Sequence, residues 1–124
     1  MSGTGEGRIL VVDDDPLVRS MLRAALTHYG YQADLVGSAE KALDLFDAAV
    51  HRVCLLDIKL PGMDGLELAQ RLIERGARGI VFISGYVGED LAGRLERIPH
   101  AGMLAKPFEL SELDRILRQA LANE

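Results

Sequence analysis

The sequence predicts an α/β fold in which helices cover both faces of a five-stranded parallel sheet. Short apolar runs alternate with longer segments of helical periodicity five times along the chain. The segments that join them are short, as is typical of right-handed crossovers between parallel strands. Residues 53–56 are continuously apolar, as expected of a central strand buried on both faces. These observations indicate a doubly wound (βα)5 arrangement.

Each predicted strand is a short apolar run bounded by turn-forming or polar residues. The runs span residues 8–12, 33–36, 53–56, 79–83 and 102–105. Cys54, the only cysteine, lies in the third run and is expected to be a buried apolar side chain. His28, His51 and His100 lie far apart, and we expect each to be an ordinary surface or helix-end residue.

The predicted helices begin at capping residues and follow the strands in order. Asp15 and Pro16 favour the start of the first helix, and Gly30 favours its end. Ser38 is expected to cap the second helix. The fourth helix has the weakest pattern and contains Gly93. The expected helices run from residue 16 to the turn at residue 30, and then over 39–49, 66–75, 89–97 and 109–121.

The composition is typical of a single soluble domain. The chain has 124 residues, of which 48% are hydrophobic and 27% are charged. No apolar run approaches the roughly 20 residues that cross a bilayer, and residues 1–7 are rich in glycine rather than apolar. We therefore expect a cytoplasmic protein without membrane insertion, with a flexible tail at 1–7 and one domain at 8–122. The net charge of −5 argues against direct nucleic-acid binding.

Polar side chains follow four of the five predicted strands, at the edge where parallel sheets bind ligands. Asp13 and Asp14 follow the first strand, Asp57 the third, Ser84 the fourth and Lys106 the fifth. Any one of them alone would most often be a cap, a turn residue or a surface charge. Together they would place three carboxylates, a hydroxyl and an ammonium side by side.

That combination predicts phosphoryl transfer that depends on Mg²⁺. Crowded carboxylates repel one another and demand a cation or a proton. Mg²⁺ suits such a site because it binds a few carboxylate oxygens together with water and phosphate oxygens. Asp57 can be the nucleophile, since carboxylates form acyl phosphates. Lys106, Ser84 and the metal can then hold the three phosphoryl oxygens.

Four motifs, in this order and spacing, resemble the receiver family of two-component signalling. They are I-L-V-V-D-D-D-P from Ile9, L-L-D-I-K-L-P-G-M-D-G from Leu55, F-I-S-G-Y from Phe82 and A-K-P-F from Ala105. The resemblance extends from about residue 8 to residue 121. It implies a flavodoxin-like receiver fold, similar to the stand-alone chemotaxis regulators, and a response regulator that signals by changing shape.

The resemblance also implies roles for the acidic residues. Asp57 is the phosphoacceptor, and Asp13 and Asp14 hold Mg²⁺, for which Mn²⁺ is expected to substitute. Asp14 is the more direct ligand, Asp13 acts partly through water, and the carbonyl of Lys59 is the backbone ligand. The phosphodonor is a phosphohistidine on a sensor histidine kinase or a histidine phosphotransfer protein.

The resemblance also implies how a signal leaves the phosphorylation site. Ser84 stands at the family's switch hydroxyl and Lys106 at its lysine, with a cis bond to Pro107. Where the family often has Tyr or Phe, this chain has Met103. We therefore expect residues 84–88 and the fourth helix to carry most of the change, with Met103 as adaptable packing.

Four residues are expected to control the exchange of the phosphoryl group with donors and water. The family docks its donors against the first helix, near Leu17 and Met21, although both could instead belong to the periphery of the core. Lys59 and Tyr86 flank the path of a hydrolytic water, so each is expected to lengthen the life of the acyl phosphate.

Two other classes of function fit parts of the sequence. A phosphatase of the haloacid-dehalogenase type would use an Asp-x-Asp motif at 13–15, but it leaves Asp57 and Ser84 unused. A receiver-like interaction module that is never phosphorylated would not need the complete set. No enzymatic activity is expected beyond self-catalysed acceptance and loss of the phosphoryl group.

Because no output domain follows the last predicted helix, we expect a single-domain regulator without DNA-binding output. It would contact an unknown protein target or act as a phosphate shuttle or sink. A receiver excised from a longer chain is the alternative.

Overall fold

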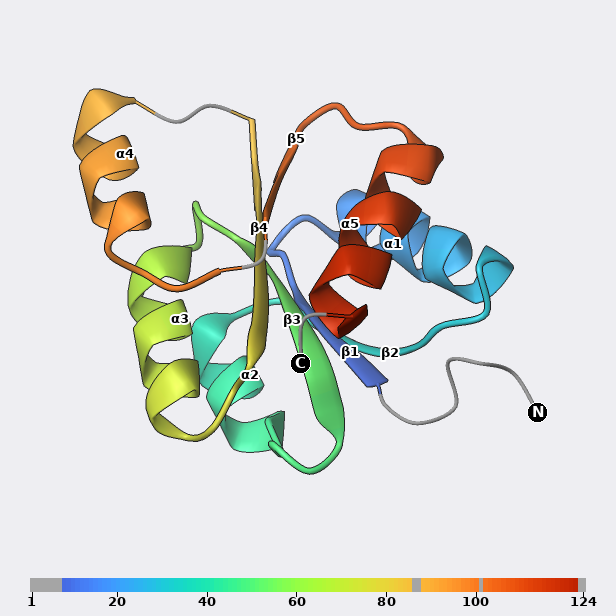
Figure 1. Cartoon of the computed structure of the whole chain (residues 1–124), viewed down its shortest axis with the longest axis horizontal. Helices are drawn as coiled ribbons and strands as arrows, with labels where there is room; N and C mark the ends of the chain where they lie inside the picture. The colour runs from blue at the N-terminus through green and yellow to red at the C-terminus, as the bar shows by residue number, and fades with distance from the viewer. Residues whose placement is uncertain (1–7, 86–87, 101, 123–124) are drawn as a thin grey trace.

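The computed structural model describes residues 8–85, 88–100 and 102–122, and strands and helices alternate throughout them (Figure 1). Five parallel strands form one sheet in the order β2-β1-β3-β4-β5, which confirms the predicted fold class. The elements are β1 (Arg8–Val12), α1 (Pro16–His28), β2 (Gln32–Val36), α2 (Ala39–Leu45), β3 (His51–Asp57), α3 (Gly65–Glu74), β4 (Gly79–Ser84), α4 (Glu89–Glu96), β5 (Gly102–Ala105) and α5 (Leu110–Ala122).

The sheet separates two layers of helices. Helices α1 and α5 cover one face, and α2, α3 and α4 lie on the other (Figure 1). Side chains alternate along β1, so that Ile9 and Val11 pack with α1 and α5, whereas Leu10 and Val12 pack with α2 and α3. Both faces of the central strands are therefore buried, which explains their continuous apolar runs.

The caps predicted for α1 and α2 are present. The Asp15 carboxylate accepts a hydrogen bond from the N–H of Leu17 at 2.9 Å. The Ser38 hydroxyl accepts from the N–H of Lys41 at 3.1 Å. Gly30 has a φ of 86°, the left-handed conformation in which glycine ends helices without strain.

Helix α2 is shorter than the sequence predicts. It ends at Leu45 rather than at residue 49, because Phe46 leaves the helical region with a ψ of 132°. The Phe46 ring stacks on His51, with 5.8 Å between centroids. The Asp47 carbonyl then accepts hydrogen bonds from the N–H groups of Val50 and His51. A tight turn and a tertiary contact thus override the helix propensity of residues 46–49.

His51 is buried, so the prediction that it lies at the surface or at a helix end is wrong. Its Nδ1 accepts from the N–H of Asp47 at 3.0 Å, which leaves the proton on Nε2, 2.9 Å from Asp34. Arg8 donates to the same carboxylate at 2.9 and 3.0 Å. The hydrogen bonds of Arg8 and then His51, against the effect of burial, hold the pKa of Asp34 below its usual range.

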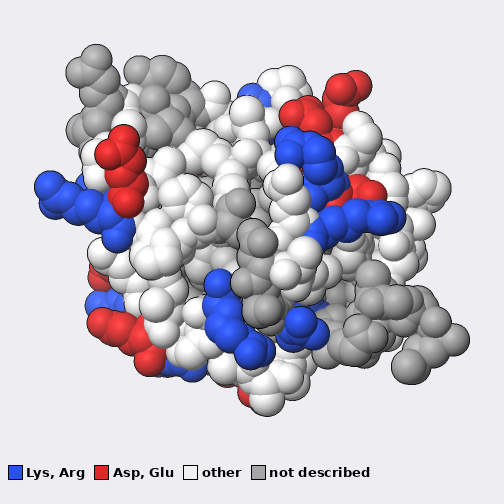
Figure 2. All heavy atoms as spheres, viewed as in Figure 1, with Lys and Arg blue, Asp and Glu red and all other residues white. Residues whose placement is uncertain are grey.

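Figure 2 shows the charges on one face of the molecule. Basic and acidic side chains occur there in separate small groups of both signs, and the described residues on that face form no continuous basic stripe. Over the part of the chain that the structure describes, no helix combines the length and the apolar character needed to cross a membrane.

Candidate functional site

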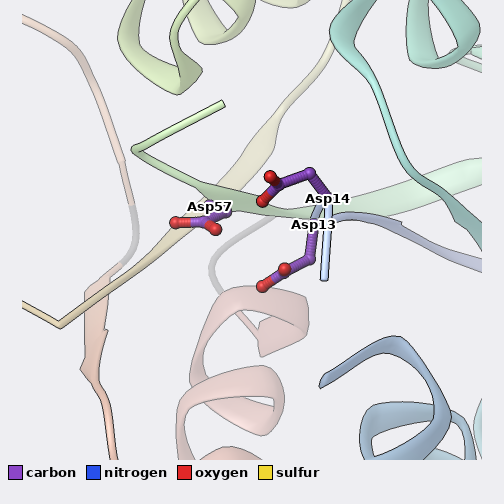
Figure 3. Close-up of side chains that lie close together, drawn as sticks. All are labelled: Asp13, Asp14 and Asp57. Carbon is purple, nitrogen blue, oxygen red and sulfur yellow. The ribbon is translucent and has the colours of Figure 1, made fainter. Parts of the chain in front are cut away.

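Three carboxylates meet at the carboxyl ends of β1 and β3 (Figure 3). Asp13 and Asp14 directly follow β1, and Asp57 is the last residue of β3. One carboxylate oxygen from each lies within 4.8 Å of the other two. Asp13 and Asp57 are buried, whereas Asp14 is exposed. The site lies where the strand order reverses, between β1 and β3, as expected for doubly wound sheets.

Lys106 joins both buried carboxylates from the end of β5. Its Nζ lies 3.0 Å from Asp13 Oδ2 and 3.3 Å from Asp57 Oδ2. Burial by itself would lower the pKa of Lys106, but the hydrogen bond to Asp13 and the charges of both carboxylates outweigh it and raise that pKa. The ammonium is therefore held in its charged form. The Lys106–Pro107 bond is cis, as predicted.

The anionic form of Asp57 is disfavoured by its surroundings. Burial raises the pKa of its carboxyl group, and the charge of Asp13 raises it further. Lys106 and the N–H of Lys59, which donates to Asp57 Oδ1 at 3.2 Å, oppose these effects without cancelling them. A cation added beside the carboxylates would relieve the repulsion between Asp13 and Asp57.

Asp13 is held by several groups at once. Its Oδ1 accepts from the N–H of Asp15 at 2.9 Å, while Oδ2 accepts from Lys106. Its own N–H donates to the carbonyl of Val36 at 3.2 Å. Nη1 of Arg19 donates to its carbonyl oxygen at 2.7 Å. Asp13 is thus fixed in the site, with the exposed Asp14 next to it in the chain.

The structure places Ser84 at the same sheet edge, at the end of β4 and buried. It is paired with Ala105, and its carbonyl accepts from the N–H of Lys106 at 2.8 Å. Lys59 is exposed two residues beyond Asp57. Tyr86 lies outside the described residues. Five of the predicted side chains thus lie at or directly after the carboxyl ends of four strands, at residues 13, 14, 57, 84 and 106.

Met103 lies in β5, opposite Phe82 in β4. It is half-buried and packs against the core cluster that also receives Leu91 and Leu95 of α4. Arg94, in the same helix, forms a salt bridge of 3.0 Å with Asp64, the residue that caps α3. The side chain of Met103 therefore lies on the face of the sheet that α4 covers.

Leu17 and Met21 are exposed on α1, with 79% and 47% of their surface accessible, so they are not part of the core. Met21 lies at the edge of an apolar groove of about 350 Å³ between α1 and the turn after β5. That groove is lined by Val18, Met21, Lys106, Pro107 and Phe108. A docking role for this surface stays a prediction.

Arg19 and Gly65 also shape the site, although neither was predicted to do so. Gly65 donates its N–H to the carbonyl of Ile58 at 2.8 Å. A Cβ at Gly65 would overlap the carbonyl oxygen of Asp57 and lie 2.9 Å from the Cα of Ile58. An Asp-Gly pair signals a turn in a sequence, but this close approach arises only in the folded chain.

The chain belongs to the response regulator receiver domain family, whose model matches residues 9–118. This membership supports the receiver interpretation over the haloacid-dehalogenase alternative. The family's role is phosphoryl acceptance within two-component systems, with histidine kinases or phosphotransfer proteins as partners.

Individual relatives agree with this assignment. The chain is 43% identical to the transcriptional regulatory protein AruR of Pseudomonas aeruginosa over 83 residues, which cover 63% of this chain and 34% of that protein. It is 29% identical to sporulation initiation phosphotransferase F of Bacillus subtilis, covering 92% of this chain and 93% of that protein. The chain spans about half or less of the length of AruR and the other first relatives.

A solved structure shows the same architecture. The signal receiver domain of a modulated diguanylate cyclase from Desulfovibrio desulfuricans superposes with a TM-score of 0.84 at 31% identity. The alignment covers 93% of each chain.

The donor set of the acidic cluster suits Mg²⁺. Receiver domains bind this ion through an acidic pocket, and Asp13, Asp14 and Asp57 offer the hard oxygen ligands that Mg²⁺ prefers. Burial and then the charge of Asp13 raise the pKa of Asp57 although Lys106 opposes them, so a further cation would favour the carboxylate form of this residue. The residues present therefore fit a divalent cation.

Proposed function

We propose that the chain accepts a phosphoryl group on Asp57 from a phosphohistidine of a sensor histidine kinase or phosphotransfer protein, in the cytoplasm. The observation that carries the proposal is the contact of Lys106 Nζ with both Asp13 and Asp57, at 3.0 and 3.3 Å, beside the exposed Asp14. A nucleophilic carboxylate, a fixed cation and acidic metal ligands then surround one point in space.

The transfer is an in-line displacement at phosphorus. A carboxylate oxygen of Asp57 forms the new O–P bond while the N–P bond of the donor breaks, and the electron pair remains on the imidazole nitrogen. Mg²⁺ held by Asp13, Asp14, Asp57 and the carbonyl of Lys59 would supply positive charge to the phosphoryl oxygens. Lys106 holds one of these oxygens, and the Ser84 hydroxyl donates to another.

The acyl phosphate then has a lifetime set by access of water. Lys59 is exposed two residues beyond Asp57, where its side chain can cover the approach to phosphorus. We assign the same role to Tyr86. The modified site then signals to a downstream protein through the segment after β4 and through α4, with Met103 of β5 as adaptable packing.

Labelling with acetyl phosphate tests the proposed function. With Mg²⁺ present, the intact chain should acquire one phosphoryl group, and peptide mapping after reduction of the acyl phosphate should place it on Asp57. Chelation of the metal should slow the reaction at least about tenfold, which corresponds to about 1.4 kcal/mol of transition-state stabilisation. Labelling of another residue would contradict the proposal, and absence of labelling with Mg²⁺ bound would favour an interaction module that is never phosphorylated.

Substitution of Leu17 by Glu tests the docking surface. Leu17→Glu puts a charge on the most exposed large apolar side chain among the described residues. Transfer from a phosphorylated histidine protein should slow by about tenfold or more, because a charge is desolvated at the interface. Labelling by acetyl phosphate should not change, since this small donor needs no docking surface.

Leu45→Glu is the matched control, because Leu45 is an exposed leucine at the end of α2. It should react normally with both donors. Equal slowing of Leu17→Glu with both donors would show damage to the fold rather than loss of docking.

A further inference from the structure

We infer that Arg19 is a positioning residue that aims Asp14 at the metal, an inference that rests on the proposed function. Arg19 lies in the first turn of α1, five residues after Asp14, and its side chain is half-buried. Its Nη1 donates to the carbonyl oxygen of Asp13 at 2.7 Å. This bond is among the shortest that the described part of the chain makes at the site.

The carbonyl that accepts this bond belongs to the peptide group between Asp13 and Asp14. A peptide group is planar, so a hydrogen bond to its oxygen fixes the orientation of the whole plane. That plane determines the direction in which Asp14 leaves the end of β1. Asp14 is exposed and, unlike Asp13, is not enclosed by the core. Its aim therefore depends on the peptide plane that Arg19 fixes.

Gly37, between β2 and α2, keeps the guanidinium group in place. A Cβ at Gly37 would lie 2.8 Å from Arg19 Nη1 and 3.4 Å from its Cζ. Gly37 does not have a positive φ, so its backbone does not itself require glycine. The absence of a side chain instead leaves the space that the planar guanidinium group occupies. Arg19 and Gly37 therefore form one unit that holds the Asp13–Asp14 peptide.

Positioning and charge predict opposite effects on metal binding. A guanidinium group is always protonated, and a positive charge beside the site repels Mg²⁺. If Arg19 acted by charge alone, its removal would strengthen Mg²⁺ binding. If it orients the ligand Asp14, its removal weakens binding, as loss of groups behind metal ligands commonly does by 10- to 100-fold as a rough range.

Calorimetric titration of the full chain with Mg²⁺ distinguishes the positioning role of Arg19 from an effect of its charge. The titration is done well below the unfolding temperature of each variant. Arg19→Ala should weaken Mg²⁺ binding about tenfold. Gly37→Ala should weaken it in the same direction but less, because it displaces the guanidinium group while keeping its charge. Arg23→Ala is the control, since Arg23 is an exposed arginine on the same helix. The Mg²⁺ affinity of this variant should equal that of the unmodified chain.

The Mg²⁺ affinities of the variants test the role of Arg19 separately from the proposed function. Unchanged or tighter binding by Arg19→Ala, with normal binding by the unmodified chain, overturns the inference and leaves the proposed function standing. Absence of Mg²⁺ binding by the unmodified chain overturns both. If Arg19→Ala does not fold, Gly37→Ala decides by the same criterion, because an alanine at residue 37 needs only the far end of a flexible side chain to move.

Discussion

Asp57→Asn should abolish labelling by acetyl phosphate and, in the absence of metal, make the protein more stable. The loss of labelling follows because an amide is not a nucleophile toward phosphorus. The gain in stability follows from the electrostatics of the site. Burial and the charge of Asp13 raise the pKa of Asp57 above its ordinary value of 3.8, so ionisation of this residue opposes folding at neutral pH.

The pH dependence of this gain has a definite sign. A carboxyl group whose pKa is higher in the folded state destabilises the fold above both pKa values, and the effect disappears as pH falls below the unfolded value. Urea unfolding should therefore find Asp57→Asn more stable at about pH 7 and similar to the unmodified chain at about pH 3. Mg²⁺ should narrow the gap at neutral pH by binding the unmodified chain more tightly.

A less stable Asp57→Asn protein at neutral pH without metal would contradict this account. It would mean that the contact between Lys106 and Asp57 outweighs the burial of the carboxylate and the charge of Asp13. Asp13, 3.0 Å from Lys106 in the unmodified chain, would remain as a partner of the ammonium in this variant.

Gly65→Ala should destabilise the protein by about 3 kcal/mol and disrupt phosphoryl acceptance. The added Cβ would overlap the backbone of Asp57 and Ile58, and backbone atoms cannot rotate away as a side chain does. The fold must therefore shift either the start of α3 or the end of β3. Because Asp57 ends β3, both shifts disturb the geometry of the nucleophile.

Gly93→Ala is the matched control for this variant. Gly93 is in α4, and a Cβ there meets nothing within 4 Å. Alanine has the higher helix propensity, so this change should stabilise the chain by up to about 1 kcal/mol. Urea unfolding of both variants compares them directly. A Gly65→Ala protein as stable as the unmodified chain would show that the sheet edge adapts more easily than we infer.

The sequence determines the sheet and the main site residues because these depend on local patterns. Apolar runs, caps and the residues after each strand can be recognised along the chain, and parallel topology brings the strand ends together. Asp57 and Lys106 are 49 residues apart, yet the order of elements alone predicted their meeting.

The remaining features depend on contacts that no local pattern records. His51 has no periodic signal, and its burial follows from Asp34 and Asp47 on other segments. The end of α2 depends on the same residue, because Phe46 stacks on its ring. The role of Arg19 was not predicted, because its side chain binds the backbone carbonyl of Asp13 and occupies space that a side chain at Gly37 would fill.

Helix α4 is weakly stabilised at its start. The N-cap residue of α4 is Gly88, which provides no side-chain cap, and helices of this length are marginal by themselves in water. Its described anchors are the half-buried Leu91 and Leu95 and the salt bridge from Arg94 to Asp64. We therefore expect the surface beneath this segment to govern its coil-to-helix balance, so that a small rearrangement there would change the secondary structure that a partner meets.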